Sequence, residues 1–252
     1  MKVFLTGASS GLGAALAREY ARHGAQLGLF ARRSDALAAL AEPFEPPPAA
    51  YVGDVRDPSA LRAAALDFTT RFGVPDVVIA NVGISHGTLT EHVEDNAVFE
   101  AILDTNVMGM VHTFQPFLAA MRASRSGKLV GVASVAGFRG LPGAGAYSAS
   151  KAAAMRYLES LRVELVGSGV DVVTICPGYV ATPMTARNPY RMPFIVPVDR
   201  AARLIVRAID RGRRFYVLPW QMAWLGRLLA MAPRPLYDRA FARVKRKPRA
   251  GG

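Results

Sequence analysis

Short apolar segments alternate along the chain with longer segments in which apolar residues recur at helical spacing. The short segments predict buried strands, and they read KVFLTG, AQLGLFA, AAYVGDV, DVVIANVG, KLVGVASV, VDVVTICPG and RFYVLPW. The longer segments predict helices over residues 11–23, 34–41, 58–72, 94–122, 147–166 and 199–211. Strands that are apolar on both faces and separated by helices predict an α/β protein with a parallel sheet covered on both sides.

Positive charge is concentrated at one end of this chain. The 252 residues carry a formal net charge of +12, with 51% hydrophobic and 20% charged residues, a composition typical of a globular protein. Residues 1–198 hold 17 basic and 16 acidic side chains, whereas residues 199–252 hold 14 basic and 3 acidic ones. A basic nucleic-acid-binding surface would involve the body of the protein, so this distribution argues against a nucleic-acid partner.

Cys176 is the only cysteine, which excludes an intramolecular disulfide and indicates a reducing compartment. The apolar start at residues 3–5 is too short for a signal-peptide core, so we expect a cytoplasmic protein. No metal is predicted, because metal-ligand spacing is missing among the four histidines, His23, His86, His92 and His112.

A glycine-rich turn, TGASSGLG, follows the first predicted strand. Gly7, Gly11 and Gly13 would let the backbone approach a pyrophosphate at a helix N-terminus, where free N–H groups attract anions. Ser9 and Ser10 add hydroxyl donors. Tight strand-to-helix contact is another reason for such glycines, but their place after a buried first strand favours a dinucleotide site.

Arg32 and Arg33 stand at the end of the second predicted strand, where an acidic residue would bind the 2′-hydroxyl of NAD. Guanidinium groups instead bind phosphate, so we predict NADP(H) as the cofactor rather than NAD(H). The alternative is a pair of solvated arginines at a helix start, although cations there oppose the helix dipole.

These motifs together resemble the short-chain dehydrogenase/reductase family over residues 2 to 218. The matching pieces are residues 6–13, Asp54-Val55, Asn81-Val82-Gly83, Asn106, Ser134, Tyr147-x-x-x-Lys151 and the segment PGYVAT at 177–182. The resemblance implies a single-domain Rossmann fold, a doubly wound parallel sheet of about seven strands. It places the cofactor-binding and catalytic domain at residues 1–218, a substrate lid at residues 183–198, and an extension of the same domain at residues 219–252.

The family resemblance assigns catalysis to four residues. Tyr147 and Lys151 share one helix face, and Tyr147 would act as general acid or base on a carbonyl or alcohol. We expect Lys151, together with an oxidised nicotinamide, to lower the pKa of the phenol and to bind the nicotinamide ribose. Ser134 would hold the substrate oxygen, and Asn106 would kink a helix and hold a water that links Lys151 to solvent. Each residue also has a structural alternative: a strand-end cap, a helix break, or an ordinary amphipathic face.

The remaining matched residues are assigned to the cofactor. The resemblance places residues 54–55 at the adenine, Asn81 and Gly83 at its ribose, and residues 177–182 at the nicotinamide. Residues 80–83 read ANVG where the family usually shows NNAG, which keeps the asparagine and the last glycine. The predicted cofactor set is Gly7, Ser9, Ser10, Gly11, Leu12, Gly13, Arg32, Arg33, Asp54, Val55, Asn81, Gly83, Tyr147, Lys151, Pro177, Gly178, Val180 and Thr182.

The predicted lid is apolar and aromatic, which indicates a substrate with a hydrophobic body. Arg187 and Arg191 in the lid either meet an anionic group or are solvated. Residues 220–232 are apolar on most faces but too short to span a bilayer. This segment could lie on an anionic membrane surface with the basic residues that follow it. We favour a helix beside the substrate cleft or on a partner subunit, followed by a disordered basic tail.

The leading hypothesis is an NADP(H)-dependent oxidoreductase acting on a carbonyl or secondary alcohol of a largely hydrophobic substrate. The alternatives are a non-catalytic NADP(H)-binding regulator and a membrane-surface lipid or ketoacyl reductase. Because the family often assembles through its long helices, here residues 94–122 and 147–166, the resemblance implies a homodimer or homotetramer.

Overall fold

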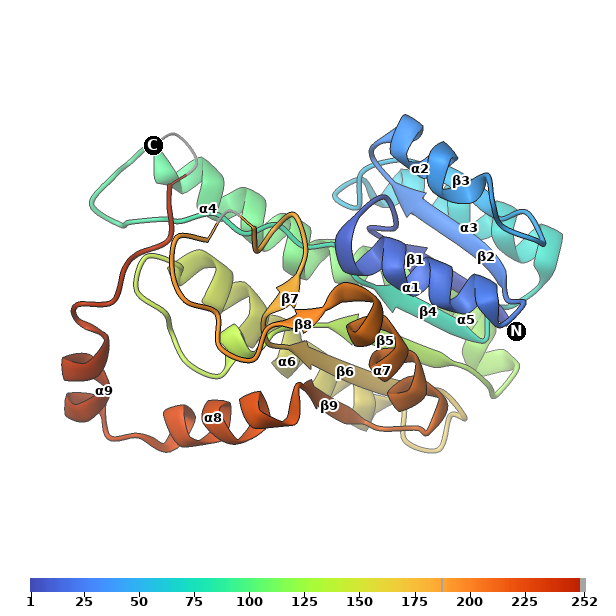
Figure 1. The fold of residues 1–252 in the computed structure, drawn as a ribbon. Helices are drawn as coiled ribbons and strands as arrows, with labels where there is room; N and C mark the ends of the chain where they lie inside the picture. Colours follow the sequence, from blue (N-terminus) through green and yellow to red (C-terminus); the bar gives the residue numbers. More distant parts are fainter. Residues whose placement is uncertain (187, 250–252) are drawn as a thin grey trace.

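The computed structural model describes residues 1–186 and 188–249 (Figure 1). Within these residues a seven-stranded parallel sheet forms the centre, in the order β3-β2-β1-β4-β5-β6-β9. Its strands are Lys2–Thr6 (β1), Gln26–Ala31 (β2), Ala49–Val52 (β3), Val77–Ala80 (β4), Lys128–Val132 (β5), Asp171–Pro177 (β6) and Phe215–Leu218 (β9). A separate short pair joins Val180–Ala181 (β7) to Val196–Pro197 (β8).

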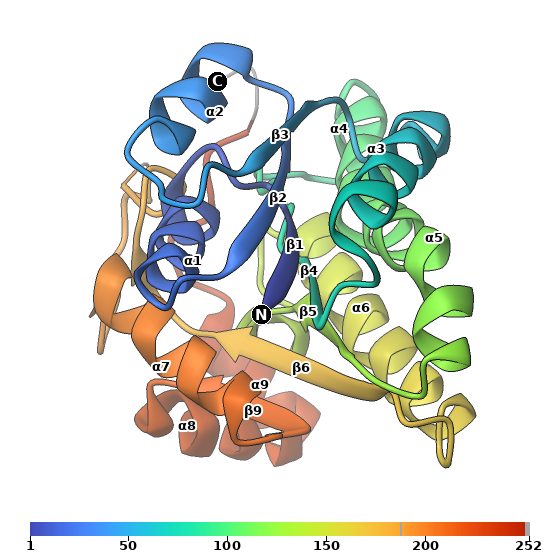
Figure 2. The same ribbon diagram turned by 90° about the vertical axis from the view of Figure 1, so that its right-hand side faces the viewer.

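Helices cover both faces of the sheet. They are Gly11–Arg22 (α1), Ser34–Ala41 (α2), Pro58–Phe72 (α3), Asp95–Leu103 (α4), Gly109–Ala123 (α5), Gly145–Glu164 (α6), Val198–Asp210 (α7), Trp220–Met231 (α8) and Arg234–Phe241 (α9). Figure 2 shows α1 and α7 on one side of the sheet and α3, α5 and α6 on the other. The protein therefore has the doubly wound Rossmann-like fold, which confirms the predicted fold class.

Each face of the sheet has its own apolar layer. Val3 and Leu5 of β1 belong to the layer beneath α1 and α7. Phe4, between them, belongs to the opposite layer with Phe68 and Phe117. Successive side chains of a strand point to opposite faces, so a strand covered on both sides must be apolar at every position.

The long helix predicted over residues 94–122 is interrupted in the structure. A π-helical turn at Asp104–Met108 separates α4 from α5, and buried Asn106 lies within it. Asn106 Nδ2 donates to the Ile84 carbonyl at 3.0 Å and to Ser150 Oγ at 2.9 Å, while its Oδ1 accepts from the Ile84 N–H at 2.8 Å. The irregular turn thus directs the amide toward the loop after β4, as expected of a π turn at a functional position.

The described residues of the predicted lid lack regular structure except at its end, where β8 and the first residue of α7 lie. Arg191 is exposed, and Arg187 lies outside the described residues. Beyond β9, α8 runs along the edge of the molecule (Figure 1). Within residues 1–186 and 188–249, each helix is too short or too polar to traverse a bilayer.

The prediction of a disordered basic tail is wrong for residues 242–249. After α9 the chain returns to the loop before α4 (Figure 1), and the Gly87 N–H donates to the Pro248 carbonyl at 2.8 Å. Arg249 pairs with Glu94 and Asp95. The tail is ordered because Arg249 meets carboxylates that are distant in sequence and close in space.

Candidate active site

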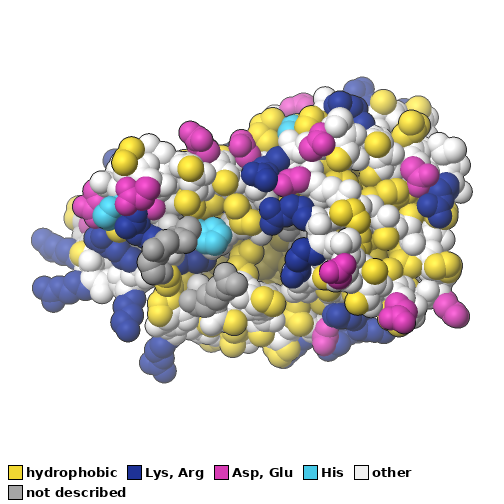
Figure 3. Space-filling model, turned by 90° about the horizontal axis from the view of Figure 1, so that it is seen from above, with side chains coloured by type: hydrophobic (Ala, Val, Ile, Leu, Met, Phe, Trp, Pro, Cys, Tyr) yellow, Lys and Arg dark blue, Asp and Glu magenta, His cyan; other side chains and the backbone are white. Residues whose placement is uncertain are grey.

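A cleft of about 500 Å³ opens at the carboxyl ends of the parallel strands, the usual ligand position in such sheets. Figure 3 shows a hollowed face of the molecule with Lys and Arg side chains beside the hollow. Every residue of the predicted cofactor set lines this cleft, and so does Ser134. Asn106 does not line it and lies buried behind it. The structure therefore brings together residues that are spread over most of the sequence.

The β1–α1 turn forms one end of the cleft, which we call the glycine end. Gly7 and Gly11 have φ values of +71° and +55°, a region that strains other residues. A side chain on Gly13 would run into the Gly7 carbonyl. Asn81 Nδ2 donates to the carbonyls of Thr6 and Gly7, both at 3.3 Å. The turn is thus bare backbone at a helix N-terminus, which fits a dinucleotide pyrophosphate.

Arg32 and Arg33 stand beside this turn. Arg33 Nη2 is 3.2 Å from both the carbonyl and the hydroxyl oxygen of Ser9. Arg32 Nη1 is 3.9 Å from an Asp54 carboxylate oxygen, and 64% of its side chain is exposed. Two guanidinium groups at the mouth of the glycine end fit a phosphate on the adenine ribose.

Asp54 is engaged by Arg56, a residue outside the predicted cofactor set. Arg56 donates from Nη2 at 2.7 Å and from Nε at 3.1 Å to the carboxylate. These bonds hold the pKa of Asp54 below its usual value. An adenine amino group at Asp54 would therefore share the carboxylate with Arg56. In the sequence, Arg56 is marked only by its position two residues after Asp54.

Ser134, Tyr147 and Lys151 form the other end of the cleft, the tyrosine end. Lys151 is buried, and its Nζ donates to the Val132 carbonyl at 2.9 Å. The same Nζ is 5.7 Å from the centre of the Tyr147 ring. A Cβ on Gly83 would be only 3.3 Å from that Nζ, so glycine leaves room for the lysine. The i, i+4 spacing on α6 thus places both side chains on the cleft.

Burial dominates the protonation of this pair. Loss of water raises the pKa of Tyr147, and a hydrogen bond with Ser134 acts in the opposite direction. Burial lowers the pKa of Lys151 to about 8. That Lys151 and an oxidised nicotinamide together lower the pKa of the phenol stays a prediction. The desolvation of the phenol prevails, and the ammonium is directed at the Val132 carbonyl.

Ser134 serves as a cap and faces the site as well. Its Oγ accepts from the Ala136 N–H at 3.2 Å and lies 3.4 Å from the Pro177 carbonyl. The Ser134 hydroxyl therefore fits both the alternative of a strand-end cap and the predicted role of holding the substrate oxygen. Asn106 reaches the same region through Ser150, whose Oγ donates to the Tyr147 carbonyl at 2.8 Å. This link from the π turn to α6 gave no signal in the sequence.

The nicotinamide segment is held by a residue outside the predicted set. Thr185 Oγ1 donates to the Val180 carbonyl at 2.6 Å and accepts from the Thr182 N–H at 3.0 Å, and it also lines the cleft.

Cys176 is buried in β6, and burial raises the pKa of its thiol to about 12. In the part of the chain that the structure describes, no group of three or more His, Cys, Asp or Glu side chains could hold a metal ion.

Residues 1–191 match the family described as short chain dehydrogenase. The chain belongs to this family of oxidoreductases. This short-chain dehydrogenase is 39% identical over 246 residues to an uncharacterized oxidoreductase of Myxococcus xanthus, with 96% of each chain covered. It is 38% identical over 187 residues to 11-beta-hydroxysteroid dehydrogenase 1A of Arabidopsis thaliana, an alignment that covers 73% of this chain and 53% of the plant protein.

Solved structures share the fold of this short-chain dehydrogenase. A short chain dehydrogenase/reductase of Burkholderia phymatum in complex with NAD has a TM-score of 0.82 at 24% identity, covering 98% of this chain and 96% of the other. One of Burkholderia cenocepacia in complex with NADP has a TM-score of 0.80 at 24% identity, covering 94% and 96%. These neighbours bind NAD in one case and NADP in the other.

Lys151 should make the folded protein more stable as the pH rises from about 8 to about 10.5. Between these values the unfolded chain keeps the lysine protonated while the folded one has lost the proton. The unfolded state then binds more protons, so the free energy of unfolding increases with pH, by on the order of 3 kcal/mol in total. Urea unfolding below and above pH 8 measures this increase.

The matched variant is Lys151→Met, which removes the titration and nearly preserves the side-chain volume. Subtracting the free energy of unfolding of this variant from that of the wild type cancels the contributions of tyrosines remote from Lys151, which also titrate at alkaline pH. The difference should grow in favour of the wild type as the pH rises. If the free energies of unfolding of the two proteins change with pH in the same way, the lowered pKa of Lys151 is contradicted.

Proposed function

We propose that this protein is an NADP(H)-dependent oxidoreductase that transfers hydride between nicotinamide and a carbonyl or secondary alcohol on a largely hydrophobic substrate. The proposal rests on one observation: a single continuous cleft joins the glycine end to the tyrosine end. Its glycine end fits a phosphorylated dinucleotide, and its tyrosine end holds a phenol, a hydroxyl and an ammonium. An acid catalyst therefore stands where a dinucleotide bound along the cleft would end.

The tyrosine end supplies the proton chemistry. The nicotinamide, when bound, supplies the hydride for reduction and accepts it in the reverse direction. Tyr147 donates its proton to the carbonyl oxygen as the general acid. Ser134 holds the same oxygen through its hydroxyl. The Lys151 ammonium stabilises the phenolate that remains.

The glycine end would hold the cofactor. The N–H groups at the start of α1 bind the pyrophosphate, and Arg32 and Arg33 bind the 2′-phosphate that distinguishes NADP from NAD. Asp54 binds the adenine, and the segment at residues 177–182 binds the nicotinamide. These roles are supported by the shared lining of the cleft.

A hydrophobic substrate is supported by the apolar side chains of the lid. Met184, Phe194 and Ile195 expose 40%, 52% and 43% of their surfaces, and Met184 also lines the cleft. When an apolar ligand covers solvated apolar side chains, apolar surface is removed from water and the free energy of the system falls. The similarity to a plant protein named as a hydroxysteroid dehydrogenase agrees with such a substrate.

Replacing Tyr147 by Phe should abolish nearly all turnover and leave NADPH binding intact, because the change removes the acidic hydroxyl and keeps the ring. Turnover is measured as NADPH oxidation with a panel of ketones, aldehydes, sugars and steroids, and binding as NADPH fluorescence. Tyr157→Phe is the matched control on the same helix, since Tyr157 packs against the apolar layer and not on the cleft.

The control should retain turnover. Near-normal turnover of Tyr147→Phe would refute the assignment of the acid. A wild-type protein that binds NADPH and reduces no member of the panel would instead favour the alternative of a non-catalytic NADP(H)-binding regulator.

Replacing Arg32 by Asp should weaken NADPH and favour NADH. The change removes a phosphate-binding guanidinium and adds a carboxylate that repels phosphate and accepts from a ribose hydroxyl. We expect the Michaelis constant for NADPH to rise ~10- to 100-fold, as for the loss of a charge-assisted hydrogen bond. Arg62→Asp, at an exposed position of α3, controls for the change in net charge. A wild-type preference for NADH would end the proposal of NADP(H).

A second property is supported by an exposed apolar stripe on α8. Trp220, Trp224, Leu228 and Met231 recur at helical spacing and expose 68%, 61%, 60% and 74% of their surfaces. We propose that this stripe contacts an anionic membrane surface, an environment in which Trp side chains and nearby cations are stabilised. The basic excess of residues 199–252 would repel a second copy of the chain and attract anionic lipid.

Flotation with vesicles tests this contact. The wild type should float with phosphatidylserine-containing vesicles and not with pure phosphatidylcholine, and Leu228→Asp should abolish flotation. Leu66→Asp is the matched control, because Leu66 on α3 is 71% exposed and lies outside the stripe. If the wild type does not float and Leu228→Asp instead dissociates a dimer, the stripe is a subunit interface.

A further inference from the structure

The C-terminal segment brings a second ammonium to the tyrosine end. We call residues 242–249 the strap. Lys247 Nζ donates to Ser85 Oγ at 2.6 Å and stands 5.6 Å from the centre of the Tyr147 ring. The distance from the same ring to the Lys151 ammonium is 5.7 Å. Two ammonium groups, from α6 and from the strap, therefore lie within 6 Å of the centre of the Tyr147 ring.

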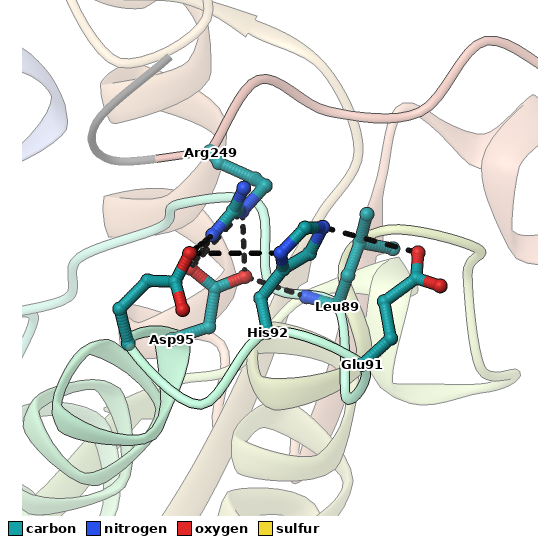
Figure 4. A network of polar contacts seen from close by, with 6 residues as sticks. Leu89, Glu91, His92, Asp95 and Arg249 are labelled. Carbon is teal, nitrogen blue, oxygen red and sulfur yellow. Dashed lines mark hydrogen bonds and ion pairs between the residues drawn. The ribbon is translucent and has the colours of Figure 1, made fainter.

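An ion pair fixes the strap in place. Arg249 donates from Nε at 2.9 Å and from Nη2 at 3.1 Å to the Asp95 carboxylate, and its Nη2 also reaches Glu94 at 2.8 Å (Figure 4). Asp95 is only 6% exposed, and its carboxylate also accepts from the Leu89 N–H at 2.8 Å. A bidentate pair with a buried carboxylate is stronger than an exposed one.

Further contacts complete the attachment on both sides of the strap. The Gly87 N–H donates to the Pro248 carbonyl at 2.8 Å, and a side chain on Gly87 would collide with that segment. Arg246 lies against Gly143, in the loop before α6. Just before the strap, the Tyr237 hydroxyl donates to the Gly140 carbonyl in the same loop. The strap thus rests on the loop after β4 and on the loop that leads into Tyr147.

Lys247 has no acidic partner among the described residues, since its contacts are a neutral hydroxyl and an aromatic face. Of the described residues that line the cleft, Asp54 is the single acid, and Arg56 engages it at the far end. Burial lowers the pKa of Lys247, so the ammonium is partly withdrawn from water. A desolvated charge without a counter-charge is stabilised by an anion.

We propose that Lys247 is a substrate-binding residue that recognises a carboxylate on a largely hydrophobic carbonyl substrate, held there by the strap as the outer wall of the site. This inference rests on the proposed function and adds the class of substrate, a keto acid. Lys247 confers specificity and takes no part in proton transfer, which the proposed function assigns to Tyr147.

Keto acids and their methyl esters distinguish this role. The substrates are phenylpyruvate and benzoylpropionate, which carry the carboxylate at two distances from the carbonyl, and their neutral esters. Lys247→Met should raise the Michaelis constant for at least one acid ~10- to 100-fold, the usual effect of losing a charge-assisted hydrogen bond, and should leave both esters unchanged. Lys245→Met is the matched control, since Lys245 is an exposed lysine of the same strap. This variant should leave the Michaelis constants for the acids and for the esters unchanged.

Arg249→Met tests the ion pair that fixes the strap. Freed from Asp95, the strap no longer holds Lys247 in place, so this variant should show the same selective loss for the acid. Equal changes for acids and esters in Lys247→Met, or no change at all, would overturn the inference.

A binding experiment separates this inference from the proposed function. Phenylacetate and phenylacetamide are compared by thermal shift on the wild type with NADP present. Phenylacetate should raise the melting temperature more than the amide does, and the difference should vanish in Lys247→Met and persist in Lys245→Met. If no carbonyl is turned over, the proposed function fails, whereas this comparison still decides the carboxylate site. Equal shifts with the two probes would reject it.

Discussion

Lys151 carries an ammonium group that is almost completely removed from water and donates a hydrogen bond to the carbonyl of Val132 at 2.9 Å. A buried charge is tolerated only with such a partner, so α6 must lie where the lysine reaches the end of β5. This constraint sets the position of Tyr147 one turn earlier on the helix. It also favours glycine at position 83, since a Cβ there would be only 3.3 Å from the Nζ.

Charge is distributed along the cleft in a way that suits anionic ligands. Guanidinium groups stand at the glycine end and an ammonium at the tyrosine end, while Asp54 is the single acid among the described residues of the lining. Arg56 already engages that acid. The field inside the cleft is therefore positive along its length, which suits a dinucleotide with its phosphates and, at the tyrosine end, an anionic substrate.

The C-terminal fifth of the chain contributes to the site from a distance. The strap contacts residues more than 150 positions earlier, because Arg249 meets Asp95 and Lys247 meets Ser85. Most of the net charge lies in this part of the sequence, and a portion of it is used in these contacts.

The sequence by itself determined the strands, the helices, the glycine-rich turn and the shared face of Tyr147 and Lys151. These features depend on neighbours within a turn of helix or a few residues of strand, so periodicity and glycine spacing reveal them. Only the tertiary structure decided the π-helical form of the expected kink at Asn106, the docking of the tail and the direction in which burial shifts the pKa of Tyr147. Those features depend on which distant groups meet and on how much water they lose, and a sequence pattern contains neither quantity.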